Sequence, residues 1–236
     1  MMSANRAQRL RLLSAARLYF VCDARPHDRD PDDLLDAALR GGADIVQMRE
    51  KSPRSAKDLI ALAEPFRRAA AEHGALFILN DRPDLAAACG ADGVHVGQDD
   101  MPLAEARRLA GATALIGLST HSPEQIEAGC GAPCGDRPDQ LSVGPVWETP
   151  TKAGRPATGL GLIELAAREA AVPWFAIGGI NVDNVADVAA AGASRIVVVR
   201  AIRDAEDPEG AARALRRGLE AAVGEPPAEH TTGAHG

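Results

Sequence analysis

The chain has 236 residues, of which 46% are hydrophobic and 3% aromatic, and 26 Lys and Arg against 33 Asp and Glu give a formal net charge of −7. This acidic balance excludes the diffuse positive surface of sequence-independent nucleic-acid binders, and the few aromatic residues offer little surface for stacking bases. We therefore expect neither nucleic acid nor an acidic membrane as a partner. A small anionic ligand stays open, because a few cations that converge in one cleft oppose the global field locally.

The apolar segments of the chain are short. Residues 196–199 are flanked by Arg195 and Arg200, which falls well below the roughly 18 apolar residues of a membrane-spanning helix. Residues 12–16 end at Arg17 and are too short for a signal-peptide core, so we expect a cytoplasmic protein. One C-x-x-x-C pair without further zinc ligands predicts structural thiols for the four cysteines, Cys22, Cys89, Cys130 and Cys134.

A repeated pattern runs through the chain, in which a helical stretch ends at Gly and then Ala and a short polar residue lead into a β-rich run. It occurs at residues 42–45, 90–93 and 192–195. Gly suits the left-handed position that closes a helix, and the apolar runs that follow are too short for amphipathic helices. The pattern predicts eight buried strands: 18–22, 45–48, 76–79, 93–96, 115–118, 140–143, 174–177 and 195–199.

Helical patterns lie between these strands. Three of them follow an Asp-Pro or Ser-Pro pair, which places a capping residue before a first-turn proline: 32–40, 124–128 and the helix that begins after Asp207-Pro208. Residues 55–73 are also predicted to be helical, with a kink or a break at Pro65.

Eight strands that alternate with helices, at roughly 25 residues per unit, match a (β/α)8 TIM barrel of the α/β class. The alternative is a doubly wound open sheet, which would usually show a Gly-rich turn after its first strand; residues 22–29 contain none. We therefore expect a single-domain barrel over residues 18–223. A helical extension at 1–17 precedes it, and a disordered tail at 224–236 follows it.

In such a barrel the active site lies at the C-terminal ends of the strands. After the second predicted strand, the two-residue period of a strand places Gln47, Arg49 and Lys51 on one face. An amide and two cations suit a phosphate or diphosphate, which Arg holds with two hydrogen bonds and Lys as a point charge. The alternative is a solvated loop in which both cations pair with nearby acids.

Two carboxylates follow neighbouring strands, Asp81 after Asn80 and Asp100 in the loop after the fourth strand. They fit Mg²⁺, which binds through one or two carboxylates and completes its shell with water and substrate phosphate. The alternative is helix capping, because Asp81 precedes Pro83 and Asp100 precedes Pro102.

The fifth strand leads to Ser119 and His121, with no acid nearby to orient the histidine. We therefore expect the Ser119 hydroxyl to hydrogen-bond a ligand rather than to attack it. His95, within the fourth strand, is expected to be a structural residue of the barrel or of an interface.

The last three strands end in features that suit a phosphate. The loop after the sixth strand carries two hydroxyls and a lysine that would close over an anion: Thr149, Thr151 and Lys152. The seventh strand ends at Gly178-Gly179 and the eighth at Val199-Arg200. Paired glycines let backbone N–H groups approach a ligand closely, and loops seven and eight form the common phosphate site of these barrels.

Six motifs stand in this order at the strand ends: Gln47-Met48-Arg49-Glu50-Lys51, Asn80-Asp81-Arg82, residues 91–98 with Asp100, Gly117-Leu118-Ser119-Thr120-His121, Thr149-Pro150-Thr151-Lys152 and Ala176-Ile177-Gly178-Gly179-Ile180. With them the chain resembles the thiamine phosphate synthase family over residues 18–202. The resemblance implies a barrel enzyme that joins hydroxymethylpyrimidine diphosphate to a second substrate, a phosphorylated methyl-hydroxyethyl-thiazole. The products would be thiamine phosphate and diphosphate.

The resemblance also implies a role for each site residue. The pyrimidine diphosphate would contact Gln47, Arg49, Lys51, Asn80, Ser119 and Lys152. Asp81 and Asp100 would hold Mg²⁺, and the catalytic cations would be Arg49, Lys51 and Lys152. The thiazole phosphate would be surrounded by Thr149, Thr151, Gly179, Val199 and Arg200. The chain departs from the family at Arg200, where Ser is frequent, and in the lead into the sixth strand at 130–140.

Two other functions compete with this one. A related thiazole tautomerase on the same fold would need neither Mg²⁺ nor a diphosphate clamp, and a non-catalytic ligand-binding module would be expected to lose the metal or diphosphate residues. The motifs around Arg49 and Lys152 and the retained acids favour the synthase. The expected partners are its two small-molecule substrates, and the sequence is compatible with a homo-oligomer.

Overall fold

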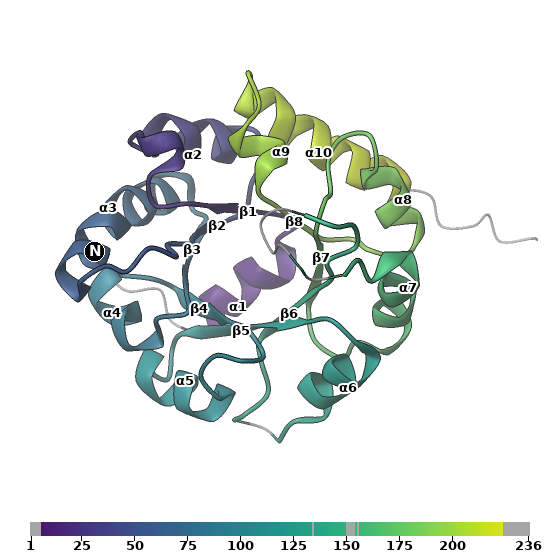
Figure 1. The fold of residues 1–236 in the computed structure, drawn as a ribbon, viewed down its shortest axis with the longest axis horizontal. Coiled ribbons are helices and arrows are strands. Elements are labelled where there is room, and N and C mark those ends of the chain that lie inside the picture. Colours follow the sequence, from purple (N-terminus) through teal and green to yellow (C-terminus); the bar gives the residue numbers. More distant parts are fainter. Residues whose placement is uncertain (1–5, 134, 150–153, 155, 224–236) are drawn as a thin grey trace, which may run out of the picture.

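A computed structural model describes residues 6–133, 135–149, 154 and 156–223. Within this part of the chain, eight parallel strands pair in sequence order and close into a barrel, and a ring of helices surrounds it (Figure 1). The strands are β1 (Leu18–Cys22), β2 (Ile45–Met48), β3 (Leu76–Asn80), β4 (Gly93–Val96), β5 (Leu115–Thr120), β6 (Gln140–Val143), β7 (Trp174–Ile177) and β8 (Ile196–Val198). The predicted (β/α)8 barrel is confirmed.

The helices are α1 (Arg6–Ala15), α2 (Asp32–Arg40), α3 (Ala56–His73), α4 (Ala86–Cys89), α5 (Leu103–Ala110), α6 (Pro123–Gly131), α7 (Gly159–Glu169), α8 (Val185–Ala190), α9 (Arg200–Arg203) and α10 (Pro208–Val223), with the 3₁₀ turns η1 (Pro26–Asp28) and η2 (Pro83–Leu85). Among the described helices, none combines the length and the apolar composition that crossing a bilayer requires.

Helix α3 runs without interruption through Pro65, so the expected break does not occur. The proline costs the helix the hydrogen bond to the carbonyl of Ala61. Burial outweighs this loss, because the helix packs Leu59, Ala63 and Phe66 against the barrel. Ser55 caps the first turn by accepting a hydrogen bond from the backbone of Asp58.

The apolar core has two layers. The larger layer lies between the strands and the surrounding helices and includes Phe20, Phe66 and Ile163. The smaller fills the barrel interior, where Tyr19 and Phe175 meet edge to face with ring centroids 5.5 Å apart. Helix α1 adds Leu13 to this interior cluster, and Figure 1 shows the helix lying across the centre of the ring. It thereby covers the N-terminal end of the barrel and leaves the opposite end open.

The predicted helix-closing glycines adopt positive φ, with 106° at Gly42, 67° at Gly90 and 101° at Gly192. The acids that follow two of them have structural partners. The Asp44 carboxylate accepts the backbone N–H of Leu18, and the Asp92 carboxylate accepts that of Phe77. These acids fix where the neighbouring strands begin. Cys22 and Cys89 are buried free thiols and Cys130 is partly exposed; Cys134 and the predicted tail at 224–236 lie outside the described residues.

Candidate active site

A cavity of about 710 Å³ opens at the C-terminal ends of the strands. All the predicted site residues that the structure describes line it: Gln47, Arg49, Lys51, Asn80, Asp81, Asp100, Ser119, Thr149, Gly179, Val199 and Arg200. Thr151 and Lys152, the other two predicted residues, lie outside the described residues. Residues at the ends of seven strands, β2 to β8, are thus brought to one place by the barrel topology.

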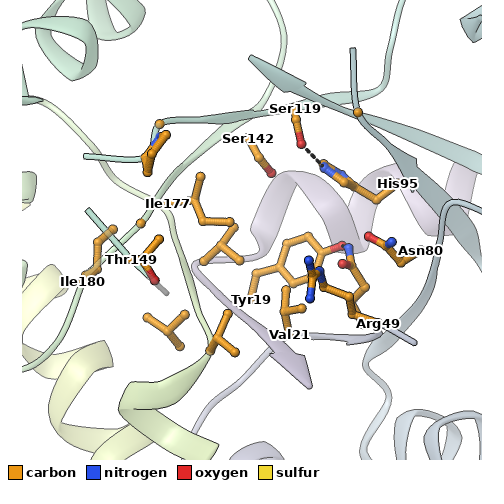
Figure 2. A pocket seen from close by; sticks show the side chains of 18 of the residues that line it. Tyr19, Val21, Arg49, Asn80, His95, Ser119, Ser142, Thr149, Ile177 and Ile180 are labelled. Carbon is orange, nitrogen blue, oxygen red and sulfur yellow. Dashed lines mark hydrogen bonds between the residues drawn. The ribbon is translucent and has the colours of Figure 1, made fainter. Parts of the chain in front are cut away.

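The cavity has two chemically different sides (Figure 2). Arg49 and Asn80 lie on one side, whereas Thr149 and Ile180 lie on the other. Ser142 is placed between them. The first side presents a cation and an amide, and the second a hydroxyl and an aliphatic surface, so the cavity suits two ligand parts of different polarity.

Three charged groups meet on the cationic side. Lys51 forms an ion pair with Asp81, and Asp100 accepts the backbone N–H of Gly97 at 2.7 Å. Burial raises the pKa of Asp81, the neighbouring Lys51 lowers it, and the Asp100 carboxyl raises it again through its charge and as a hydrogen-bond partner. The pKa of Asp81 stays above its usual value, because burial is the largest of these effects and the Asp100 carboxyl adds to it.

The backbone of Asp81 is left-handed, with φ at 58°. Asp is one of the few L residues that adopt this conformation readily, and such residues are common at functional sites. Its N–H donates to the carbonyl of His95 at 2.9 Å, which ties the end of β3 to β4. Neither acid caps a helix: η2 and α5 have Arg82 and Pro102 at their cap positions, without a side-chain cap bond.

The opposite side is built by two backbone segments that run together beyond β6 and β7. The N–H of Val146 donates to the carbonyl of Ile177 at 2.9 Å, and that of Trp147 to the carbonyl of Gly178 at 3.1 Å. A Cβ at Gly178 or Gly179 would lie 2.4 or 2.8 Å from side-chain atoms of this neighbouring segment, and both φ angles are positive. The predicted glycine pair is therefore required by close backbone packing.

Polar side chains inside the barrel form the floor of the cavity. The Gln47 amide donates to the Tyr19 hydroxyl at 2.6 Å, and burial raises the pKa of Tyr19 strongly, so the phenol stays neutral. On the other strands, His95 contacts Ser119 at 2.9 Å and Gln140 at 3.2 Å. His95 is thus a barrel residue as expected, but it also lines the cavity.

Other residues that line the cavity had no role assigned from the sequence: Tyr19, Gln98, His121 and Ser142. Gln98 donates to the carbonyl of Ser119 at 2.7 Å, and His121 contacts the carbonyl of Gly144. A signal existed for Ser142, because polar Gln140 and Ser142 alternate with apolar residues along one buried strand.

Comparison with known proteins finds similar chains of one family. A family model described as thiamine monophosphate synthase matches residues 18–202. The thiamine-phosphate synthase of Arthrobacter sp. (strain FB24) is 49% identical over 230 residues, which cover 89% of this chain and 97% of that protein. The one from Thermobifida fusca is 51% identical over 212 residues, which cover 89% and 95%.

Among solved structures, a thiamine phosphate pyrophosphorylase from Pyrococcus furiosus is similar, with a TM-score of 0.79 and 33% sequence identity. The match covers 90% of this chain and all of that one. Fold, motif order and relatives agree over nearly the same residues. The chain therefore belongs to the thiamine monophosphate synthase family.

Proposed function

We propose that this protein condenses hydroxymethylpyrimidine diphosphate with phosphorylated methyl-hydroxyethyl-thiazole. The products are thiamine phosphate and diphosphate. The observation that carries the proposal is the convergence of the predicted diphosphate, metal and phosphate residues on one cavity. The bond between the pyrimidine methylene carbon and the diphosphate oxygen breaks, and its electron pair leaves with the diphosphate. The thiazole nitrogen then captures the resulting carbocation and forms the new carbon–nitrogen bond.

The cationic side suits the pyrimidine diphosphate. Arg49 and Lys51 would bind its phosphate oxygens, and Asn80 would add an amide contact. Their charge stabilises the diphosphate more strongly as its negative charge grows during departure, which is the difference that lowers a barrier. Lys152 would add a third cation from the loop that follows β6. Arg49, Lys51 and Lys152 would thus both bind the substrate and stabilise the departing diphosphate.

The opposite side suits the thiazole phosphate. Thr149 and Thr151 would supply hydroxyls, and Gly179 and Val199 would let the ligand lie against the backbone. Arg200 lines the same side and begins α9. In place of the serine frequent in the family, it would add a positive charge to this phosphate site.

The acid pair fits Mg²⁺. Asp81 and Asp100 are hard oxygen ligands that lie close enough to perturb one another, and a bound dication would relieve their repulsion. When bound, Mg²⁺ would neutralise charge on the departing diphosphate. Because Lys51 pairs with Asp81, it would contact both a metal ligand and the diphosphate.

This reaction needs no protein nucleophile or general base. What the site has to supply is charge stabilisation and the alignment of two substrates, which is worth several orders of magnitude in rate. The cavity volume of about 710 Å³ leaves room for both substrates together. The residue types at the strand ends, cations, amides and hydroxyls, match that requirement.

The test is to mix the purified protein with both phosphorylated substrates and Mg²⁺ and to measure thiamine phosphate by chromatography. We expect formation of thiamine phosphate and an equal amount of diphosphate, and loss of both when the metal is chelated. A tautomerase would convert its thiazole substrate without Mg²⁺ or the pyrimidine. Binding of both substrates without product would instead indicate a non-catalytic module, and either result would refute the proposed synthase activity.

A further inference from the structure

We propose that His95 is a positioning residue that fixes the direction of the Ser119 hydroxyl, and that Gln140 in turn fixes His95. The proposal rests on the synthase activity argued above, and it concerns how the pyrimidine diphosphate is aligned. The three side chains come from β4, β5 and β6 and form a continuous chain of polar contacts across the barrel interior. Figure 2 shows the contact between His95 and Ser119 at the edge of the cavity.

The hydrogen positions follow from the chemistry of the amide. Gln140 Nε2 lies 3.2 Å from His95 Nδ1, and an amide nitrogen only donates, so Nδ1 accepts. A neutral imidazole that accepts at Nδ1 carries its hydrogen on Nε2. That nitrogen lies 2.9 Å from Ser119 Oγ and donates to it. The Ser119 hydrogen is therefore directed away from His95, and with substrate bound its acceptor would be on the pyrimidine diphosphate.

This polarity argues against the competing role of Ser119 as a nucleophile. A serine and a histidine at 2.9 Å have the spacing of a nucleophile and its base. A base, however, needs a lone pair on the nitrogen that faces the hydroxyl, and here that nitrogen carries the hydrogen. A carboxylate in place of Gln140 would orient the ring the other way, as in a serine hydrolase.

The surroundings hold this chain in place. Gln140, His95 and Ser119 are 4%, 7% and 5% exposed, so water competes little for their hydrogen bonds. Gly117 provides the necessary space: a Cβ there would lie 2.1 Å from Gln140 Nε2 and 2.6 Å from His95 Nδ1. The Gln140 amide contacts His95 through Nε2, and its Oε1 atom has no hydrogen-bond partner among the described residues.

A double-mutant cycle tests whether His95 acts through Ser119. We expect Ser119→Ala to lower kcat by a factor of about 10², because one hydrogen-bond donor to the negative charge that develops on the diphosphate is lost. His95→Leu should lower kcat by about tenfold, the scale of one hydrogen bond, with KM for the thiazole phosphate unchanged. In the Ser119→Ala background, His95→Leu should change kcat by about twofold or less, because the two residues act as one unit.

Two further variants separate positioning from folding. His95→Gln restores an N–H donor towards Ser119 and should recover most of the kcat that His95→Leu loses. Gly117→Ala removes none of the three side chains but pushes Gln140 and His95 apart, so it should lower kcat only while Ser119 is present. The matched controls are His73→Leu, on the exposed end of α3, and Gly161→Ala, whose Cβ would meet no atom within 4 Å.

Each outcome bears on the proposal. Loss of kcat by His95→Leu that is equal in both backgrounds, or a Gln variant as slow as the Leu variant, would overturn it. A wild-type protein that makes no thiamine phosphate would instead refute the proposed activity, so the two failures are distinguishable. Thermal unfolding of every variant is measured as well. The cycle compares the effect of His95→Leu with and without Ser119→Ala. Lost stability alone would lower kcat in both backgrounds and would not produce the expected non-additivity.

Discussion

The charges that matter in the cavity belong to a few side chains, and their effect depends on how they are grouped. Lys51, Asp81 and Asp100 form one group, in which an ammonium partly compensates two carboxylates. The net charge of the chain is −7, so its overall field opposes an anionic substrate. Local placement of Arg49 and Lys51 at the cavity has to reverse that field for phosphate binding to occur.

Asp81→Asn tests the metal role without disturbing the backbone, because Asn also adopts left-handed conformations readily. We expect kcat/KM to fall by about 10² or more, since a neutral amide is a weaker ligand for Mg²⁺ than a carboxylate. The measurement is the steady-state rate across a Mg²⁺ titration. Asp84→Asn, in the next turn and paired with Arg82, is the matched control. Full activity of Asp81→Asn with unchanged Mg²⁺ dependence would contradict the assignment.

Lys152→Ala tests the third catalytic cation, which the Thr149-Pro150-Thr151-Lys152 motif predicts. We expect kcat to fall by about 10², the loss of one charge-stabilising donor in the transition state. Lys57→Ala, on the exposed first turn of α3, should leave the rate unchanged. If only KM rises, Lys152 binds substrate without stabilising the departing charge.

Strand ends could be placed from the sequence because their signals are local. The helix-closing glycines and short apolar runs predicted all eight strands, with bounds that differ by two residues or less. The predicted end of β8 at Val199 was one residue too long, because α9 begins at Arg200. Of the kink or break expected at Pro65, the break does not occur, because burial of one face of α3 depends on packing that is not visible locally.

The polar floor of the barrel was harder to predict, because it depends on contacts between strands. The period of a strand predicts that Gln47 faces inward, but its partner Tyr19 belongs to another strand. Likewise, Gln140 has room beside His95 only because residue 117 on the intervening strand is a glycine. Such contacts link residues far apart in sequence, so the local pattern of a single sequence does not reveal them.

The two segments beyond β6 and β7 should act together, which Gly179→Ala tests. Its Cβ would lie 2.8 Å from that of Trp147 and would displace the segment that carries Thr149. We expect KM for the thiazole phosphate to rise by about tenfold, since misplacement of binding groups costs alignment. The experiment compares KM for both substrates.

Gly74→Ala is the matched control, because φ is +66° there and +70° at Gly179, but a Cβ at Gly74 would meet no atom within 4 Å. Both variants should lose about 1 kcal/mol of unfolding free energy from the left-handed backbone. Only Gly179→Ala should change KM. An equal change in both would show that backbone strain, and not contact with Trp147, is responsible.

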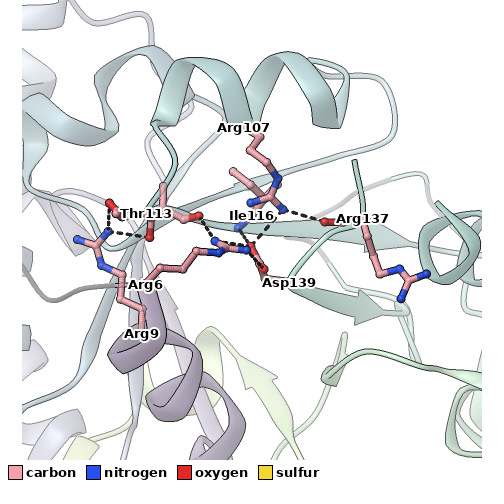
Figure 3. A network of polar contacts seen from close by, with 8 residues as sticks. Arg6, Arg9, Arg107, Thr113, Ile116, Arg137 and Asp139 are labelled. Atoms are coloured by element: carbon pink, nitrogen blue, oxygen red, sulfur yellow. Dashed lines mark hydrogen bonds and ion pairs between the residues drawn. The ribbon is translucent and has the colours of Figure 1, made fainter. Parts of the chain in front are cut away.

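The two ends of the barrel have different tasks. The C-terminal end holds the cavity, whereas at the N-terminal end α1 is tied to the strands by ion pairs and hydrogen bonds (Figure 3). Arg9 pairs with Asp92 at 2.9 Å, and Arg6 pairs with Asp139 at 2.6 Å. Arg107 of α5 contacts Asp139 at 3.3 Å. This separation of stability from chemistry is typical of the barrel fold.

Asp139→Ala should destabilise the protein without altering its chemistry. The carboxylate is 8% exposed and accepts hydrogen bonds from the Ile116 N–H at 2.8 Å and from Arg6 and Arg107. Its removal leaves the Ile116 N–H without its acceptor and takes a carboxylate partner from two guanidinium groups, which keep only backbone carbonyls, so we expect a loss of about 3 kcal/mol in unfolding free energy. Urea denaturation measures that loss, and Asp136→Ala in the same loop is the control.

Because the cavity lies at the opposite end of the strands, kcat per folded molecule should equal that of the wild type. A fall in kcat without a fall in stability would mean that the two ends of the barrel are coupled.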